Sequence, residues 1–225
     1  MIDGDAGTDA DLRRYYAKRA SEYEAIYAKP ERQSDLATMT TRALDTFRGR
    51  RVIEVACGTG WWSRHIASVA TSLDALDINE ETLAIARTKP APHGVARFSV
   101  GDAYAPPTPS QPHDAAFAGF WWSHVLKSDL PRFLDGLHRV LAPGATVVFL
   151  DNNYVEGSST PVSRIDGNGD SWQTRTLGDG STHDVLKNFP GEDELLAVVA
   201  PWTRDATVMQ YDYFWWLEYT LMERA

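Results

Sequence analysis

From residue 51 to residue 151 the sequence alternates short apolar runs with amphipathic stretches, and this alternation restricts the possible fold more than any other feature. The apolar runs predict strands over 51–56, 72–77, 96–102, 115–120 and 145–151. The stretches between them predict helices over 61–69, 80–88 and 130–142, the last of them stopped by Pro143-Gly144. Strands that alternate with helices pair in parallel, because each helix carries the chain back to the start of the next strand. We therefore expect an α/β fold with helices on both faces of the sheet.

The two ends of the chain follow other patterns. Residues 9–28 predict an amphipathic helix and 35–47 a second one, whereas 155–183 are rich in Gly, Ser, Thr and Asp and indicate a loop leading into a hairpin. The predicted hairpin arms are 172–177 and 182–189, joined at Gly178-Asp179-Gly180. A helix near 192–200 precedes two strands, 203–211 and 213–221, which are expected to be antiparallel. No repeat or long linker divides the chain, so we expect one domain.

Composition excludes several classes of protein. Hydrophobic residues make up 43% of the 225 residues and charged residues 24%, which is typical of a globular domain. No apolar run is long enough to cross a bilayer, and the polar, acidic N-terminus lacks the apolar stretch of a signal peptide. The single cysteine, Cys57, allows no internal disulfide, so we expect a cytoplasmic protein. A net charge of -9 opposes long contacts with a phosphate backbone, so nucleic acid is not an expected partner. Since no apolar run is long enough to cross a bilayer, a membrane is not an expected partner either.

The junction between the first strand and its helix carries the strongest chemical signal, Cys57-Gly58-Thr59-Gly60. Glycine lets the backbone approach a ligand, and the start of a helix offers unpaired N–H groups and the positive end of a dipole. This geometry suits S-adenosylmethionine as well as a dinucleotide, but Ser63 replaces the third glycine of the dinucleotide pattern. Glu54, near the end of the strand, suits a ligand amino group and would repel a pyrophosphate.

Two aspartates at strand ends extend this signal. Asp77, 17 residues beyond Gly60, is placed to accept hydrogen bonds from ribose hydroxyls, and Asp102 to accept one from an adenine amino group. Each also has a structural interpretation, Asp77 as a helix N-cap and Asp102 as a turn residue. Their joint occurrence behind the glycine turn favours binding of a nucleoside.

The glycine turn, the segment LDINEETLAIAR (76–87) and the run LAPGATVVFLD (141–151) resemble the class I S-adenosylmethionine-dependent methyltransferases, over about residues 50–151. Three further segments, 15–24, 116–125 and 174–189, are similar to a bacterial small-molecule subgroup that includes the phosphonate O-methyltransferase of dehydrophos biosynthesis. The resemblance implies a Rossmann-like, mostly parallel, seven-stranded sheet of order 3-2-1-4-5-7-6, with S-adenosyl-L-methionine as cofactor. The domain then divides into an N-terminal helical lid (1–48), a cofactor-binding core (49–151), a loop and hairpin cap (152–190), and a C-terminal helix with strands (191–225).

Within this family the expected cofactor residues lie in the first helix, around the glycine turn and at strand ends. Tyr16 and Arg19 fall about one helical turn apart and are predicted to clamp the methionine carboxylate, although aromatic packing of a lid helix also explains such a pattern. Ala56 stands where the family has the first glycine of the loop, a change common in the subgroup. The full expected set is Tyr16, Arg19, Glu54, Ala56, Cys57, Gly58, Gly60, Trp61, Asp77, Ile78, Asp102, Ala103 and Phe120.

Fewer residues are candidates for the methyl acceptor. His124, just beyond the fourth strand, is the candidate catalytic base, and its alternative interpretation is a packed histidine that holds the loop. A base is needed only for a hydroxyl or a protonated amine, because a carboxylate or phosphonate oxygen attacks unaided. Tyr15 and Trp121 are candidate substrate-binding residues.

The hairpin supplies two candidate cations. With its turn centred on Asp179, Leu177 pairs with Ser181 and Arg175 with His183. Regular pleating then puts Arg175 and Lys187 on one face, which suggests that they bind an anionic acceptor. The alternative is two solvated charges on an exposed hairpin.

Asp151-Asn152 invites comparison with the magnesium pair of catechol-type methyltransferases. Those enzymes also need an aspartate after the fourth strand, where this chain has Phe120-Trp121-Trp122, so we expect no metal. The sequence predicts methyl transfer to a small molecule by a monomer or homodimer, as O-methylation of an anionic or polar metabolite. N-methylation of a small metabolite, a nicotinamide-dependent oxidoreductase and a non-catalytic binding module are the alternatives.

Overall fold

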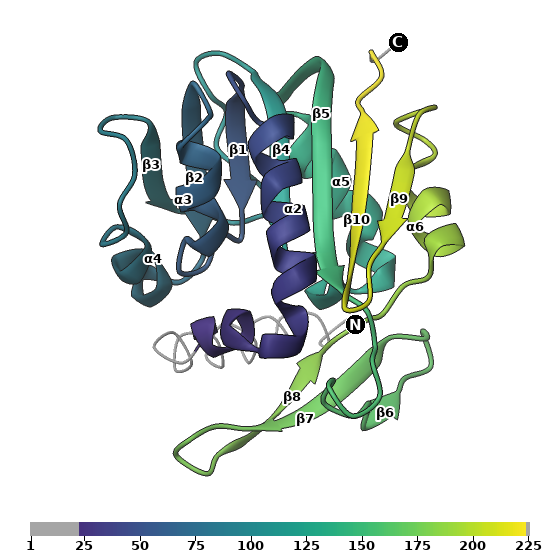
Figure 1. Cartoon of the computed structure of the whole chain (residues 1–225). Coiled ribbons are helices and arrows are strands. Elements are labelled where there is room, and N and C mark those ends of the chain that lie inside the picture. The colour runs from purple at the N-terminus through teal and green to yellow at the C-terminus, as the bar shows by residue number, and fades with distance from the viewer. Residues whose placement is uncertain (1–22, 224–225) are drawn as a thin grey trace.

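A seven-stranded sheet forms the centre of the structure, a computed structural model that describes residues 23–223 (Figure 1). Its order, β3-β2-β1-β4-β5-β10-β9, confirms the predicted order, since β9 and β10 are the sixth and seventh strands of this sheet along the chain. The first five strands of this order, β3, β2, β1, β4 and β5, pair in parallel, and β10 is antiparallel to both of its neighbours. The strands are β1 Arg51–Val55, β2 Ser72–Asp77, β3 Ala96–Val100, β4 His113–Gly119, β5 Leu141–Asn152, β9 Thr207–Gln210 and β10 Phe214–Thr220.

Helices cover both faces of the sheet, as the alternation in the sequence predicts. α2 (Gln33–Thr46), α3 (Trp61–Ala67) and α4 (Glu80–Ala86) share one apolar cluster with the sheet, and α5 (Leu130–His138) and α6 (Glu192–Val199) share the other. Side chains alternate along β4 between the two clusters, with Phe117 in the first and its neighbours Ala116 and Ala118 in the second. The core therefore consists of two apolar layers separated by the sheet.

The carboxyl ends of the parallel strands meet at one edge of the sheet, and two further parts of the chain lie at this edge (Figure 1). One is the short 3-10 segment η1 (Tyr23–Ala28) with η2 (Pro30–Arg32), and the other is a separate sheet of order β6-β7-β8. Its strands are β6 Arg164–Ile165, β7 Ser171–Thr176 and β8 Thr182–Leu186. β7 and β8 confirm the predicted hairpin, and Arg175 pairs with His183 as expected.

Two predicted elements differ from the structure. The helix predicted over 130–142 ends at His138, and β5 already begins at Leu141, so Pro143-Gly144 lies inside a strand and does not stop the helix. A register shift between His113 and Ala115 of β4 marks an irregularity that accommodates Pro143 and the left-handed Gly144 (φ 76°). The helix predicted over 9–28 falls largely outside the described residues, and its described part is the 3-10 segment η1.

The helices of residues 23–223 are too short or too polar to traverse a lipid bilayer.

Candidate functional site

The glycine turn between β1 and α3 has three residues in the left-handed region: Ala56 (φ 52°), Gly58 (φ 55°) and Gly60 (φ 76°). Gly60 is the N-cap of α3, and a Cβ atom there would lie 2.9 Å from Cβ of Ala86 in α4. Packing of α3 against α4 therefore requires this glycine, whereas close approach of a ligand was the reason expected from the sequence. Ala56 adopts the conformation that a glycine would adopt more readily, consistent with its place in the pattern.

Glu54 is the penultimate residue of β1, and its carboxyl group is buried with 2% exposure. Its Oε2 atom has no hydrogen-bond partner among residues 23–223. Burial raises the pKa of Glu54 to about 8. A buried carboxyl oxygen without a partner suits a cationic or N–H group of a ligand, so the residue fits the amino group of S-adenosylmethionine.

Asp77, the last residue of β2, binds the backbone on both sides of the site. Its Oδ2 accepts a hydrogen bond from the Gly58 N–H (2.8 Å), and its Oδ1 accepts from the Asn79 N–H (2.9 Å) and the Thr82 hydroxyl (3.1 Å). Burial raises the pKa of Asp77, although these hydrogen bonds oppose the shift. The carboxylate thus holds the glycine turn against the start of α4, and a carboxylate retains acceptor capacity beyond three bonds.

Asp102 and its neighbours form the other predicted nucleoside contacts. Asp102 is exposed in the loop after β3, where Oδ1 accepts a hydrogen bond from the Tyr104 N–H (2.9 Å), as the turn interpretation predicts. Ala103 is buried in the apolar cluster of α5 and α6, and Ile78, after β2, is half-buried. Contact of these three residues with adenine stays a prediction.

The segment η1 closes over the glycine turn. Glu24 accepts a hydrogen bond from the Thr59 hydroxyl (2.8 Å) and pairs with Lys89, which also donates to the Thr59 carbonyl. The ring of Tyr27 stacks on Trp61, with centroids 4.3 Å apart and planes at 7°. These contacts were absent from the sequence-based expectation, because Glu24 and Lys89 are 65 residues apart and no local pattern joins them. Tyr15, Tyr16 and Arg19 lie outside the described residues.

Cys57, in the same turn, is buried, and burial raises the pKa of its thiol well above the ordinary value. The thiol therefore stays protonated at neutral pH. Its contact with the cofactor stays a prediction.

Three successive aromatic residues follow β4 and point in different directions. Phe120 has a left-handed backbone (φ 60°), which strains a bulky residue, and its ring lies 5.8 Å from that of Tyr27 and 5.7 Å from that of Phe214. Trp121 packs against Val185 of β8, and its indole N–H is buried without a hydrogen-bond partner among the described residues. Trp122 is a core residue at 2% exposure.

His124 lies in the 3-10 segment η3 (Trp122–His124) and is 7% exposed. Its Nδ1–H donates to the carbonyl oxygen of Leu186 at 2.6 Å, which joins the loop after β4 to the end of β8. This supports the interpretation of a packed histidine that holds the loop. The same bond places the proton of a neutral ring on Nδ1 and leaves Nε2 as the basic nitrogen, so a role as a base stays a prediction.

Lys187 is buried beneath the hairpin with 4% exposure, which excludes a solvated charge at this position. Its ammonium donates to Asp151 Oδ1 (2.7 Å) and to Ser123 Oγ (2.6 Å). Asp151, at 0% exposure, also accepts from the Ser123 N–H at 3.0 Å. Burial lowers the pKa of Lys187, and the charge of Asp151 opposes the shift. The ion pair therefore fixes the carboxyl end of β8 to the carboxyl end of β5.

Arg175 of β7 is half-buried and donates from Nε (3.1 Å) and Nη2 (2.7 Å) to Gln173 Oε1. In the hairpin register, Arg175 opposite His183 and Gln173 opposite Val185 share a face, and Lys187 continues it by parity. The predicted common face of Arg175 and Lys187 is thus consistent with the observed register. The buried partners of Lys187 are what sequence reasoning missed, since Ser123 and Asp151 are far away along the chain.

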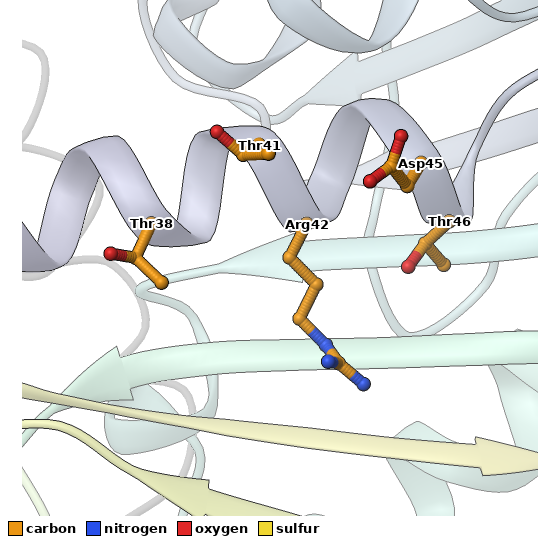
Figure 2. A pocket seen from close by; sticks show the side chains of 5 residues that line it. All are labelled: Thr38, Thr41, Arg42, Asp45 and Thr46. Carbon is orange, nitrogen blue, oxygen red and sulfur yellow. The ribbon is translucent and has the colours of Figure 1, made fainter.

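Asp151 has little capacity for a metal in this arrangement, because Lys187 already neutralises its charge. Among residues 23–223, no three His, Cys, Asp or Glu residues are grouped to hold a metal ion. A surface depression lies elsewhere, along α2, where it is lined by side chains of one helix (Figure 2): Thr38, Thr41, Arg42, Asp45 and Thr46. It contains none of the predicted site residues.

Comparison with protein families identifies residues 52–144 as matching the methyltransferase domain. Among curated proteins, a malonyl-[acyl-carrier protein] O-methyltransferase of Serratia marcescens is 28% identical over 160 residues, which are 70% of this chain and 56% of that protein. A demethylmenaquinone methyltransferase of Clavibacter sepedonicus is 28% identical over 166 residues, 69% of this chain and 64% of that protein. The chain thus spans less than two thirds of the length of these curated relatives.

Two solved structures match nearly the whole chain. The complex of DhpI with SAH has 28% sequence identity and a TM-score of 0.78, and the match covers 97% of this chain and 99% of DhpI. A complex of DhpI with SAM and HEP has the same identity and a TM-score of 0.74, with 94% and 97% covered. The similarity therefore includes the η1 and hairpin regions as well as the central sheet.

Proposed function

Because this chain belongs to the class I S-adenosylmethionine-dependent methyltransferases, we propose that it transfers the methyl group of S-adenosylmethionine to an oxygen of a small anionic acceptor. The observation that supports the cofactor most directly is the pairing of a whole-chain match to SAH- and SAM-bound structures with an intact glycine turn. The match to a methyltransferase domain favours this activity over the nicotinamide-dependent oxidoreductase considered as an alternative.

The proposed cofactor site uses the groups at the ends of β1 and β2. Glu54 would bind the amino group, Asp77 the ribose hydroxyls, and the N–H groups at the start of α3 the remaining acceptors. When bound, S-adenosylmethionine supplies an activated methyl group on sulfur. The residues of this chain then have to orient the acceptor and exclude water, and η1 and the hairpin are placed to do so.

The proposed acceptor site lies beneath the hairpin, away from the ends of β1 and β2 that form the proposed cofactor site. Arg175 offers a guanidinium with a planar fork of donors, Lys187 fixes the strand below it, and Trp121 supplies a buried indole N–H. An acceptor carboxylate or phosphonate oxygen needs no general base, which agrees with a His124 ring engaged in holding the hairpin. The malonyl group named for the curated relatives carries a carboxylate, and this gives the proposal a precedent.

Two measurements test the proposed function. Calorimetry should detect binding of S-adenosylmethionine and of S-adenosylhomocysteine but not of NAD. A set of small carboxylates, phosphonates, amines and phenols should then be screened for release of S-adenosylhomocysteine. Turnover with neutral amines alone would replace O-methylation by N-methylation, and cofactor binding without any turnover would favour a binding module. We also propose a cytoplasmic protein that acts on its small molecule as a monomer or homodimer.

A further inference from the structure

Arg32, which sequence reasoning did not single out, lies at the same edge as the proposed acceptor site. It ends η2, and its Cζ atom lies 5.7 Å from the ring centre of Phe214 and 5.5 Å from that of Tyr213. Phe214 pairs in register with Asn152, the residue after Asp151. The η2 segment therefore brings a guanidinium to the strand end that carries the Lys187–Asp151 pair.

The guanidinium of Arg32 is buried and has no direct carboxylate partner among residues 23–223. Its side chain is 7% exposed, and its Nη2 donates to the hydroxyl of Ser158 at 3.0 Å. Nε has no hydrogen-bond partner among residues 23–223. Burial lowers the pKa of Arg32, and the charge of Glu31, whose Oε1 accepts from the Ser158 hydroxyl at 3.2 Å, opposes the shift from a distance. A guanidinium removed from water is compensated only by acceptors or an anion, so this environment is incomplete without a further group.

Arg42, ten residues along, shows the contrasting arrangement. Its Cζ lies 5.7 Å from the ring centre of Trp216, and its Nε (3.2 Å) and Nη2 (3.0 Å) donate to Glu218 Oε2. Figure 2 shows this side chain extending from α2 across the strands. Arg42, stacked on the neighbouring part of β10, thus has a direct carboxylate partner, whereas Arg32 has none among residues 23–223.

Other cations surround the same region. The pKa of Lys187 is lowered first by burial, and the charges of Arg175 and Arg32 add to the shift. One buried carboxylate, Asp151, contacts Lys187 and is already paired with it. Arg32, Arg175 and Lys187 thus lie close enough for their charges to interact, with Asp151 and Glu31 as neighbouring carboxylates.

We propose that Arg32 is a third cation of the acceptor site and binds an acidic oxygen of the methyl acceptor together with Arg175. This inference rests on the proposed methyl transfer to an anionic acceptor and specifies which residue selects for the anion. The cofactor is a less suitable partner, since the glycine turn and Glu54 belong to β1, whereas Arg32 packs on β10 next to the end of β5. A carboxylate and a phosphonate share the required chemistry, so the test includes one of each.

The test titrates methylphosphonate and acetate into the full chain saturated with S-adenosylhomocysteine and follows binding by NMR line broadening. We expect the wild type to bind at least one of the two anions and Arg32→Gln to bind it at least about tenfold more weakly. Arg32→Lys should recover part of the loss, because it keeps the charge without the fork. Affinity for S-adenosylhomocysteine should stay within about twofold in all variants. The probe that binds more tightly identifies the acidic group.

Two control variants separate this role from structural ones. Ser158→Ala removes the loop contact of Arg32 and keeps its charge, and Arg42→Gln removes a stacked arginine that has a counterion. Both should bind the anion as the wild type does. Anion affinity unchanged in Arg32→Gln, an equal loss in Ser158→Ala, or a loss of S-adenosylhomocysteine affinity in Arg32→Gln would each overturn the inference. A wild-type protein that binds neither anion would overturn the anionic acceptor itself, and the role of Arg32 with it.

Discussion

Burial of Glu54 in β1 links ligand binding, pH and stability at a single residue. Its pKa rises from an ordinary value of 4.5 to about 8 on folding. As the pH rises, a carboxyl group with a raised folded-state pKa loses its proton at a lower pH in the unfolded chain than in the folded one. The contribution of Glu54 to the stability is therefore largest below pH 4.5 and is lost as the pH rises from there to about 8. A ligand amino group would reverse the penalty by pairing with the ionised form.

Glu54→Gln keeps the shape of the side chain and removes this titration. We expect the variant to be about 1–3 kcal/mol more stable than the wild type at pH 8, with the difference vanishing below pH 4.5, as measured by urea unfolding across this range. Its affinity for S-adenosylmethionine should fall at least about tenfold at pH 8. Glu80→Gln, on an exposed carboxylate paired with Arg87, is the control and should change stability by less than about 0.5 kcal/mol. Equal stability of Glu54→Gln and wild type at pH 8 would contradict the buried, uncompensated carboxyl group.

Asp77 combines a structural and a proposed binding role in one carboxylate. Asp77→Ala should weaken cofactor binding by roughly 1.5–3 kcal/mol in calorimetry, because charge-assisted hydrogen bonds to the ribose are lost. The variant also loses the bonds to Gly58 and Asn79, so its Tm is needed beside the affinity. Thr82→Val removes one partner of Asp77 without removing the carboxylate, and its cofactor affinity should stay within about threefold. Near-unchanged affinity in a folded Asp77→Ala protein would remove the ribose assignment.

At the scale of elements, the hairpin depends on a few buried polar contacts more than on apolar packing. Among its buried side chains, Val185 forms a separate small apolar cluster, with Trp121 and Leu177 packed against it. The polar links are Lys187 to Asp151 and Ser123, His124 to Leu186, and the Asn188 N–H to the Ser123 carbonyl. Loss of one partner of a buried pair leaves an uncompensated charge, so these contacts act together.

Lys187→Met should therefore loosen the hairpin while sparing the main sheet. We expect a destabilisation of about 3–5 kcal/mol in the hairpin, seen as faster hydrogen exchange of the β7 and β8 amides, with the β1 and β4 amides little changed. The double variant Lys187→Met/Asp151→Leu should recover part of this loss, since no buried charge remains. Lys127→Met, which breaks the half-exposed pair with Glu194, is the control and should cost less than about 1 kcal/mol. Uniformly faster exchange across the whole chain would show that the hairpin is not a separate unit.

At the scale of the whole molecule, the parallel pairing and the covering of both faces were predictable from the alternation of apolar runs and amphipathic stretches. The order of the seven strands followed only from the resemblance to the methyltransferase family. The hairpin register was predictable too, since Gly178-Asp179-Gly180 fixes the turn. The start of β5 was not, because Pro143-Gly144 is tolerated there only through the irregular pairing with β4. Contacts between distant residues were also missed: Glu24 with Lys89, Arg32 with Ser158, and Lys187 with Asp151 are 65, 126 and 36 residues apart. Such pairs form when helices and strands pack against one another, so no local sequence pattern predicts them.

The long-range ion pair between Lys187 and Asp151 also affects whether a metal ion can bind here. Since Lys187 neutralises Asp151, a divalent ion would have to displace an ammonium to use this carboxylate. Methyl transfer should accordingly be unaffected by excess EDTA in an assay for S-adenosylhomocysteine release. Loss of turnover on chelation that magnesium restores would make Asp151 and Asn152 ligands and require the ion pair to open.

Residues 153–190, which include the hairpin, lie between β5 and β10 along the chain. These two strands pair directly with each other. β5 and β10 are in register from Phe214 opposite Asn152 to Thr220 opposite Thr146, while the chain between them contains the three-stranded sheet β6-β7-β8, followed by α6 and β9. The insertion leaves and returns at one edge, where the Asn153 N–H donates to the Tyr213 carbonyl and the Asn188 N–H to the Ser123 carbonyl. Residues 153–190 therefore form a segment whose sequence can change, or be exchanged for that of a related enzyme, without altering the pairing of β5 with β10. With the proposed acceptor site beneath this segment, a change of acceptor requires no change in the seven-stranded sheet.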